Sequence, residues 1–268
     1  MKQLQIVRVE SDIAHSCADV VAVEEPLELV LEYWLDGKLR RKQLAITMRT
    51  PNDDQALAAG FLWAEGIITT TKSIAGFSQH DNRLTVTLDR AIEPNLDQIE
   101  RHFLLGSSCG VCGKASIESL QRQHCQMLPD DTMTITPSMI MQLPTKLRAA
   151  QTDFGATGGV HAAGLFDANG NLLDLAEDVG RHNALDKLIG RHVLANNLPL
   201  HDKLMLLSGR ISFELVQKAV LAGVPVLAAV GAPSSLAIEL AQTFNQTLIG
   251  FVREQRMNVY CGGGRIRT

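Results

Sequence analysis

The chain has 268 residues, of which 46% are hydrophobic and 20% are charged, enough for one large domain or two smaller ones with hydrophobic cores. Its net charge of −4 argues against a nucleic-acid-binding surface, because such surfaces are strongly basic. No apolar run reaches the roughly 20 residues of a membrane span, and residues 1–5 contain no signal-peptide core. We therefore expect a cytoplasmic protein that contacts neither nucleic acid nor membrane.

The first half of the chain predicts strands and hairpins with two short helices. Apolar residues alternate from Leu27 to Tyr33, Asp36-Gly37 has the composition of a two-residue turn, and a second strand returns over Gln43–Met48. Asn52 begins a helix whose many small residues predict burial. Two further elements follow, a strand over residues 83–88 and an amphipathic helix over residues 95–103.

Two cysteines share a glycine-rich loop, Leu105–Lys114, where we expect the chemistry of the chain to occur. Cys109 and Cys112 are separated by two residues, and the sequence after Lys114 predicts a helix. N–H groups at a helix start and the Lys114 ammonium both favour the thiolate, which is the nucleophilic form. Glycines on both sides leave the loop mobile. The total of five cysteines is odd and predicts no disulfide framework in a reducing compartment; the others are scattered, at Cys17, Cys125 and Cys261.

A single CxxC pair has several meanings. A structural zinc site needs four ligands, and without a second CxxC or an HxxxH only a coincidence of folding could supply them, from His102, His124, Cys125 or His161. A thioredoxin-like redox pair starts a helix directly after a central strand, whereas a helix and a loop precede this pair. We predict no metal site and favour a nucleophilic or sulfur-carrying cysteine, with the second thiol as an auxiliary.

The composition changes between Gln126 and Pro144 towards Pro, Asp, Thr and Met. We place there the seam between an N-terminal α+β subdomain, residues 1–130, and a second domain, residues 131–268. Thr136-Pro137 begins a helix, and strands and helices then alternate over residues 161–166, 172–176, 181–194, 203–207, 212–221, 224–230, 234–244 and 247–252. This alternation predicts an α/β sheet covered by helices. We expect the tail, Gly262–Arg267, to be frayed.

The glycines before the first strand of this sheet are candidate ligand contacts. Gly158 and Gly159 either let the backbone approach a ligand or form a simple turn. His161, which follows them, is either a polar contact to that ligand or a hydrogen-bonded core histidine. The residues alone leave both alternatives open.

A second candidate is the ionisable cluster over Glu177–Lys187. A capped and solvated helix start explains its acidic residues. It does not explain Arg181, His182 and Asn183, because cations are disfavoured at a helix N-terminus. Such clustered donors can receive a phosphate group or the edge of a base.

Two junctions between a strand and the next helix expose backbone N–H groups at the carboxyl end of the sheet, where open α/β folds bind ligands. Neither junction is a P-loop or GxGxxG, so the sequence does not support a nucleotide site of the ATP or NAD type. After the last strand, two arginines three residues apart form either an exposed turn or a clamp on phosphate or guanine. The candidate contacts from these segments are Ser208, Gly209, Arg210, Gly231, Ala232, Ser234, Phe251, Val252, Arg253, Glu254, Gln255 and Arg256.

Six motifs, in order, closely resemble the FdhD/NarQ family of formate dehydrogenase accessory sulfurtransferases: SSCGVCGK, ATGGVHAAGLFD, EDVGRHNALDK, LSGRISFELVQKA, GVPVLAAVGAPSSLAIELA and FVREQRMNVY. The resemblance covers Glu24–Tyr260 and implies a sulfur carrier. A cysteine desulfurase would donate sulfur, which the carrier holds as a persulfide and passes to the molybdenum of bis-molybdopterin guanine dinucleotide. The cofactor then enters formate dehydrogenase. It is a bound substrate with GDP as an analogue, and no cofactor is permanently bound.

The resemblance also assigns residues and a fold. Cys109 looks like the persulfide cysteine, Cys112 like the second thiol, and Phe251–Arg256 like part of the cofactor site. The implied fold is a cytidine-deaminase-like α/β/α core in the C-terminal half with a smaller N-terminal subdomain, working as a homodimer. Deamination itself is not expected, because His161 is followed by two alanines in place of the HxE motif and no PCxxC is present. The glycine-lined helix starts suit the pyrophosphates and guanines, as do Arg181, Arg210, Arg253 and Arg256.

Two other functions stay open at this point. One is a thiol-disulfide oxidoreductase that needs both Cys109 and Cys112. The other is a non-catalytic chaperone that only holds the molybdenum cofactor, for which neither thiol would be needed.

Overall fold

A computed structural model describes residues 1–92, 94, 127–130 and 133–267. The expected helix over residues 95–103, the CxxC loop with Cys109 and Cys112, and the helix after Lys114 lie outside these residues. The described part combines sheets with helices that cover them, so the predicted α/β class is confirmed. Among its helices, none is both long enough and apolar enough to cross a membrane.

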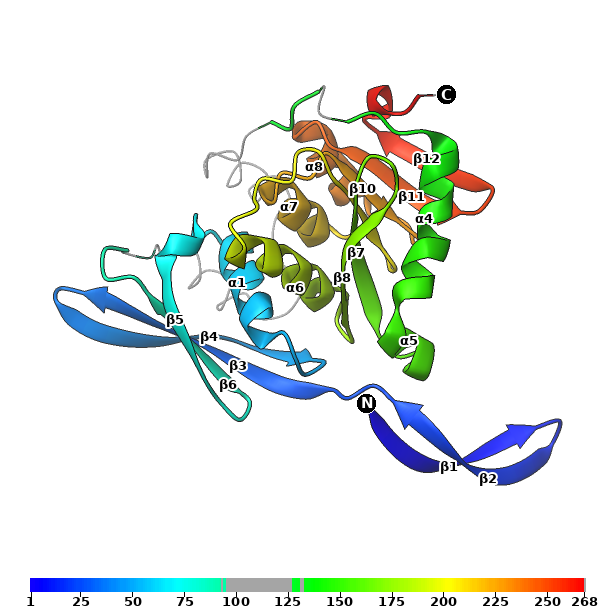
Figure 1. Cartoon of the computed structure of the whole chain (residues 1–268), viewed down its shortest axis with the longest axis horizontal. Helices are drawn as coiled ribbons and strands as arrows, with labels where there is room; N and C mark the ends of the chain where they lie inside the picture. The colour runs from blue at the N-terminus through cyan, green and yellow to red at the C-terminus, as the bar shows by residue number, and fades with distance from the viewer. Residues whose placement is uncertain (93, 95–126, 131–132, 268) are drawn as a thin grey trace.

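The second half is built on a six-stranded sheet with the order β12-β11-β10-β9-β7-β8 (Figure 1). β9, β10 and β11 are parallel to one another, whereas β7, β8 and β12 run antiparallel to their neighbours. The strands are β7 (His161–Phe166), β8 (Leu172–Asp178), β9 (Leu204–Leu207), β10 (Val226–Ala229), β11 (Thr247–Arg253) and β12 (Arg256–Cys261). Because parallel neighbours need a crossover, a helix follows β9 and another follows β10.

Helices bury both faces of this sheet (Figure 1). Within β9, Leu204 and Leu206 face a core cluster with α4, whereas Met205 and Leu207 face the cluster that contains α6, α7 and α8. This arrangement explains the short, continuously apolar strands, because a strand buried on both faces has no polar alternation. The helices are α4 (Pro137–Ala150), α5 (Thr152–Thr157), α6 (Arg181–Leu194), α7 (Phe213–Leu221) and α8 (Ser235–Thr243).

The first half contributes a four-stranded sheet with the order β4-β3-β6-β5 and one helix, α1 (Asp54–Ala64). Its strands are β3 (Glu25–Leu35), β4 (Lys38–Arg49), β5 (Ile74–His80) and β6 (Arg83–Leu88), and a short 3-10 turn, η1 (Thr71–Ser73), precedes β5. The predicted turn at Asp36-Gly37 is confirmed, with φ of 51° and 71° at its two residues. α1 is almost wholly buried, as its small residues predict.

α1 and α6 cross with their backbones in contact, and this contact joins the two halves. A Cβ on Gly60 would lie 2.0 Å from the Asp186 carbonyl oxygen, and one on Gly190 would lie 1.8 Å from the Ala56 carbonyl oxygen. Only glycine fits at both positions. One hydrophobic core therefore runs from the four-stranded sheet through α1 and α6 to the six-stranded sheet.

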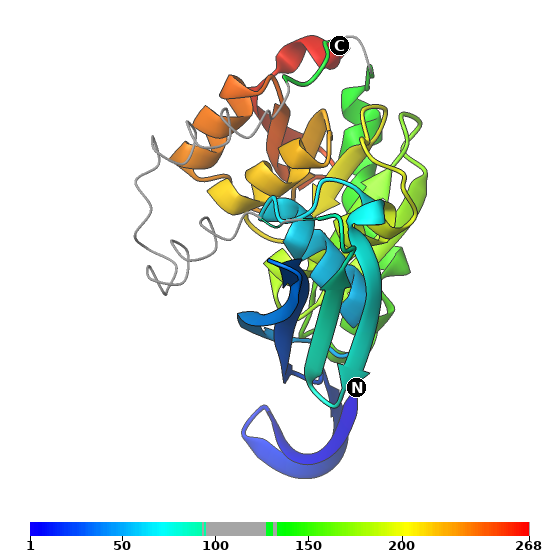
Figure 2. The same cartoon turned by 90° about the vertical axis from the view of Figure 1, so that its left-hand side faces the viewer.

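A two-stranded hairpin, here called the arm, precedes the first sheet and was not predicted from the sequence. It consists of β1 (Lys2–Glu10) and β2 (Ile13–Val21), which pair along their whole length. Figure 2 shows it projecting from the rest of the molecule. Several of its large apolar side chains are exposed, at Leu4, Val7, Val9 and Ile13.

The expectation of a frayed C-terminal tail is wrong. Arg265 lies in a short 3-10 turn, η2 (Gly263–Arg265), and is only 4% exposed. Its guanidinium donates to the carbonyl oxygens of Asn245 and Pro129 at 2.8 and 2.7 Å. The next residues bridge to Ile135, whose carbonyl accepts from the Arg267 N–H at 2.9 Å. These hydrogen bonds fix a segment whose glycines alone suggest disorder.

Candidate functional site

The carboxyl ends of β9, β10 and β11 meet at one edge of the six-stranded sheet, here called the sheet edge. β7 runs antiparallel to β9, so its first residue, His161, lies at the same edge. Ser208 ties the two strands together there: its N–H donates to the Ala162 carbonyl at 3.0 Å, and its Oγ accepts from the Ala162 N–H at 2.8 Å. The structure thus brings two of the predicted contacts, His161 and Ser208, side by side.

The two glycine junctions lie against each other at this edge. The Gly231 N–H donates to the Gly209 carbonyl at 3.0 Å, and the Gly231 carbonyl accepts from the Phe251 N–H at 3.0 Å. A Cβ on Gly231 would lie 2.6 Å from the Gly209 oxygen, so no side chain fits. The backbones of the loops that follow β9 and β10 are therefore hydrogen-bonded to each other and to β11 at the sheet edge.

Arg181, the first residue of α6, reaches the same surface. A Cβ on Gly209 would lie 3.3 Å from His161 Nδ1 and 3.8 Å from Arg181 Cδ. Burial, followed by the positive charge of Arg181, lowers the pKa of His161, so the ring is neutral at neutral pH. Arg181 Nε is buried without a hydrogen-bond partner among the described residues. An N–H donor left unsatisfied beside an open backbone surface suits an anionic ligand.

The Phe251–Arg256 segment closes the edge on its β11 side. Phe251 has a φ of 54°, unusual for a bulky residue, and a departure of this kind is common at ligand-binding sites. The Arg253 guanidinium donates to the Val230 carbonyl at 2.8 Å, which fastens the β11–β12 hairpin to the end of β10. The side chains of Arg253, Glu254, Gln255 and Arg256 are all exposed. Val252 differs, because its side chain is buried in the core beneath α4.

The remaining predicted contacts divide into exposed positions and structural ones. Arg210 is exposed, and Ala232 uses its carbonyl to accept from the Ile211 N–H at 3.0 Å. Ser234 caps α8 by accepting from the Ala237 N–H at 3.2 Å. Gly158 ends α5 with a φ of 66°, and with Gly159 it forms an exposed lead into β7.

Asn183 joins the two halves of the molecule. Its amide nitrogen donates to the Met48 carbonyl at 2.8 Å and to Asp178 Oδ1 at 3.1 Å, and its oxygen accepts from the Thr47 hydroxyl at 3.2 Å. These bonds connect β4 to the start of α6. Asn183 therefore holds the start of α6 in place, and its side chain is already engaged.

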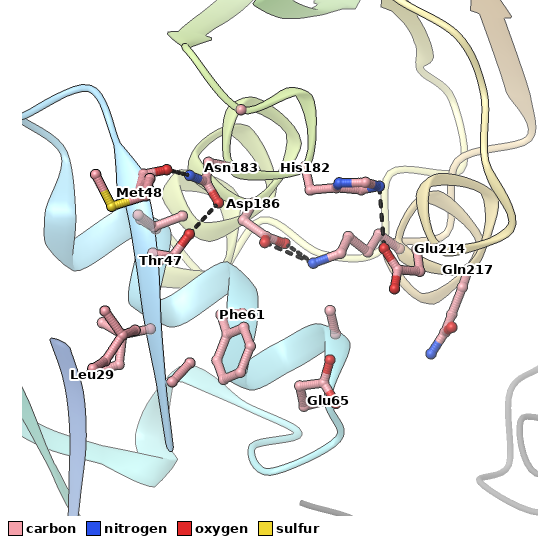
Figure 3. Close-up of a pocket in the computed structure, with 16 residues that line it drawn as sticks. Leu29, Thr47, Met48, Phe61, Glu65, His182, Asn183, Asp186, Glu214 and Gln217 are labelled. Carbon is pink, nitrogen blue, oxygen red and sulfur yellow. Dashed lines mark hydrogen bonds and ion pairs between the residues drawn. The ribbon is translucent and has the colours of Figure 1, made fainter. Parts of the chain in front are cut away.

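His182 lines a cavity between the two halves (Figure 3). Its Nε2 lies 3.1 Å from the Ser212 hydroxyl and 3.2 Å from the Glu214 carboxylate. Burial outweighs the attraction of Glu214 and lowers the pKa of His182 to about 4. The ring is therefore neutral at neutral pH.

Two buried ion pairs, each with one partner on α6, were not predicted from the sequence. Lys187 Nζ lies 2.7 Å from Asp178 Oδ2, and Lys218 Nζ lies 2.6 Å from Asp186 Oδ1. The sequence contains a sign of them, because charged residues occupy positions of α6 and α7 at which the apolar pattern predicts a buried side chain. No three His, Cys, Asp or Glu side chains of the described segments converge as a metal site would require.

Comparison with known proteins decides the family. The FdhD/NarQ family matches residues 22–267. The chain belongs to the FdhD/NarQ family. Curated relatives in this family include the sulfur carrier protein FdhD of Streptomyces coelicolor, 44% identical over 98% of this chain and 94% of that protein, and that of Picrophilus torridus, 45% identical over 92% of each. The resemblance of the six motifs is thereby confirmed.

A solved structure shares the fold of this FdhD/NarQ protein. The crystal structure is described as that of a formate dehydrogenase accessory protein from Desulfotalea psychrophila. It superposes with a TM-score of 0.75 and covers 99% of both chains, at 24% sequence identity. At this identity the match establishes the fold alone.

Proposed function

We propose that this FdhD/NarQ protein carries sulfur as a persulfide on Cys109 and delivers it to the molybdenum of bis-molybdopterin guanine dinucleotide, for use by formate dehydrogenase. The observation that carries the proposal is the family membership, since relatives more than 40% identical over nearly the whole chain are named sulfur carrier proteins. The sulfur would come from a cysteine desulfurase. Both cysteines lie outside the described residues, so their support is the SSCGVCGK motif.

The first step is an exchange between two thiols. The Cys109 thiolate attacks the terminal sulfur of the donor persulfide, a sulfur–sulfur bond forms on Cys109, and the donor cysteine leaves as a thiolate. Transfer to the metal as sulfide then needs two electrons. Oxidation of Cys109 and Cys112 to a disulfide would supply them, after which a cellular thiol must reduce the pair.

The sheet edge supports the binding of the cofactor. Its pyrophosphates need N–H donors and positive charge, and the edge offers the guanidinium of Arg181, whose Nε has no partner among the described residues, beside Gly209. The exposed side chains of Arg253 and Arg256 lie on the hairpin that closes the same edge. We propose that these residues hold the guanine dinucleotide ends as a substrate.

We also propose a homodimer, which the arm supports. A two-stranded hairpin is marginally stable alone in water, and this one carries exposed Val7 and Val9. Pairing with a second copy would cover these side chains.

The test is the mass of the protein after incubation with a cysteine desulfurase and cysteine. We expect an addition of about one sulfur atom, mapped to Cys109 by peptide mass spectrometry, and no addition in Cys109→Ala. Cys17→Ala is the matched control, since it removes a thiol of the arm that stands apart from the motif. A thiol-disulfide oxidoreductase would gain no sulfur. A Cys109→Ala variant that still supported formate dehydrogenase activity would indicate a cofactor chaperone.

A further inference from the structure

The cavity that His182 faces is large enough for a small organic ligand. It measures about 440 Å³ and lies between β4, α1, α6 and α7 (Figure 3). Gly180 and His182 line it, while Arg181 between them reaches the sheet edge, where its Cδ lies 3.8 Å from the place of a Cβ on Gly209. The cavity and the sheet edge therefore adjoin at the start of α6.

The cavity is lined by apolar side chains and a few polar groups. Leu29, Leu57 and the ring of Phe61 form apolar walls, and Ile46 and Met48 stand at the exposed rim on β4. Such a surface suits a flat ring that stacks on apolar and aromatic side chains and is oriented by polar groups at its edge.

Asp186 supplies the polar group best placed to orient a ring. The carboxylate is 3% exposed, and its two oxygens accept from Lys218 Nζ at 2.6 and 2.7 Å. An ionised carboxylate has about four acceptor positions, so each oxygen keeps one after binding Lys218. Burial raises the pKa of Asp186 to about 6 against the attraction of Lys218. N–H donors at the remaining acceptor positions would stabilise the ionised carboxylate.

Two adjacent N–H donors on a flat ring match these free acceptor positions. The 2-amino-4-oxopyrimidine ring presents such a pair, its ring N–H and its amino group, and guanine and pterin both contain it. We propose that the cavity binds this ring, with the carboxylate of Asp186 accepting its paired N–H donors and Phe61 contacting its face. The inference rests on the proposed function, because the cofactor delivers both rings next to pyrophosphates that the sheet edge can hold.

The test fills the cavity and measures ring binding. Ala45 lines the cavity on β4 opposite Leu29, so Ala45→Phe would occupy the space, whereas Leu39→Phe adds the same ring to an exposed site on that strand outside the cavity. The probes are 6-hydroxymethylpterin and GDP, with affinity measured by calorimetry. We expect Ala45→Phe to weaken at least one of them about 10-fold or more and Leu39→Phe to change neither. A loss confined to the pterin places the pterin in the cavity, and a loss of GDP places the guanine there.

A second measurement uses the unmodified protein. 6-Hydroxymethyllumazine and IDP lack the 2-amino group of 6-hydroxymethylpterin and GDP, so each should bind its site about 10-fold more weakly if a carboxylate accepts a hydrogen bond from that group. If Ala45→Phe does not fold, this comparison alone tests whether Asp186 binds the ring. The proposal is overturned if neither probe binds the wild type, or if both bind Ala45→Phe normally and the analogues bind as well as their parents. Sulfur loading of Cys109 is measured separately, so the sulfur-carrier function survives that result.

Discussion

Lys218 Nζ donates to both carboxylate oxygens of Asp186, at 2.6 and 2.7 Å, in the interior where α6 meets α7. Both side chains are almost fully buried. A buried pair of this kind adds little stability relative to apolar residues of the same size, but removing one partner leaves an uncompensated charge in the core. The pair is therefore costly to break, and the proposed binding of a ring by Asp186 gives a reason for its presence in the interior.

Lys218→Met should lower the free energy of unfolding by about 3–5 kcal/mol, because Asp186 then stays buried without a partner. The double variant Asp186→Leu/Lys218→Met should recover most of that loss. Urea denaturation of the three proteins at pH 7.5 measures both effects. A single variant within about 1 kcal/mol of the wild type would show that the carboxylate is reached by water or takes up a proton at little cost.

His182 should make stability depend on pH in the opposite sense to Asp186. Its pKa in the folded protein, about 4, lies below the ordinary value of 6.5, so its contribution is complete above pH 6.5 and is lost as the pH falls towards 4. Asp186 has its pKa raised from 3.8 to about 6, so its contribution is complete below pH 3.8 and is lost as the pH rises through 6. The two effects partly cancel in the wild type.

Replacing His182 by Gln separates the two effects. Between pH 7 and pH 5 the stability of the wild type should fall relative to His182→Gln by on the order of 1–2 kcal/mol, a range reduced for partial exposure of the ring. Denaturant unfolding at several pH values gives the difference. His80→Gln, on the exposed end of β5, is the control and should follow the wild type in parallel. Parallel curves for His182→Gln as well would mean that the ring takes up a proton as easily in the folded state as in the unfolded state.

Local patterns were sufficient to predict most of the regular structure. Strands Arg83–Leu88 and His161–Phe166 and helix Arg181–Leu194 were predicted with the bounds that the structure has. Each has a clear periodicity and a turn or cap at its ends. The sheet edge was also predicted, because the carboxyl ends of parallel strands must meet there.

Features that depend on distant parts of the chain were not predictable. The tail is ordered because Arg265 donates to Asn245 and Pro129, which are far from it in sequence. Val252 and Asn183 were predicted as ligand contacts; the side chain of the first is buried beneath α4, and that of the second bonds to β4 while lining the cavity. Periodicity tells which residues are on one face of an element, but not which other element covers that face.

Gly231→Ala should damage the sheet edge. A Cβ there would lie 2.6 Å from the Gly209 carbonyl oxygen and 2.8 Å from Arg210 Cα, so the two junctions must move apart. We expect a loss of about 1–3 kcal/mol in unfolding free energy and a GDP affinity at least about 10-fold weaker. Gly264→Ala is the control, because a Cβ there meets nothing within 4 Å. Normal GDP binding by Gly231→Ala would place the diphosphate away from this edge.

The arm should be required for the proposed homodimer. Val7, Val9 and Ile13 are 68%, 64% and 69% exposed, and an exposed apolar hairpin is stable only when another surface covers it. Light scattering after size exclusion should give about twice the 29.2 kDa chain mass for the full protein and a single chain mass for a variant that lacks residues 1–21.

Val7→Asp/Val9→Asp should have the same effect as the deletion without shortening the chain, because two carboxylates on the arm oppose its burial. Arg8→Ala, between them on the other face of β1, serves as the control. The melting temperature of the rest of the protein should change little in all three variants, since no residue of the arm belongs to its hydrophobic core. A dimer that persists without the arm would show that the two copies meet elsewhere, and the exposed valines would then need another partner.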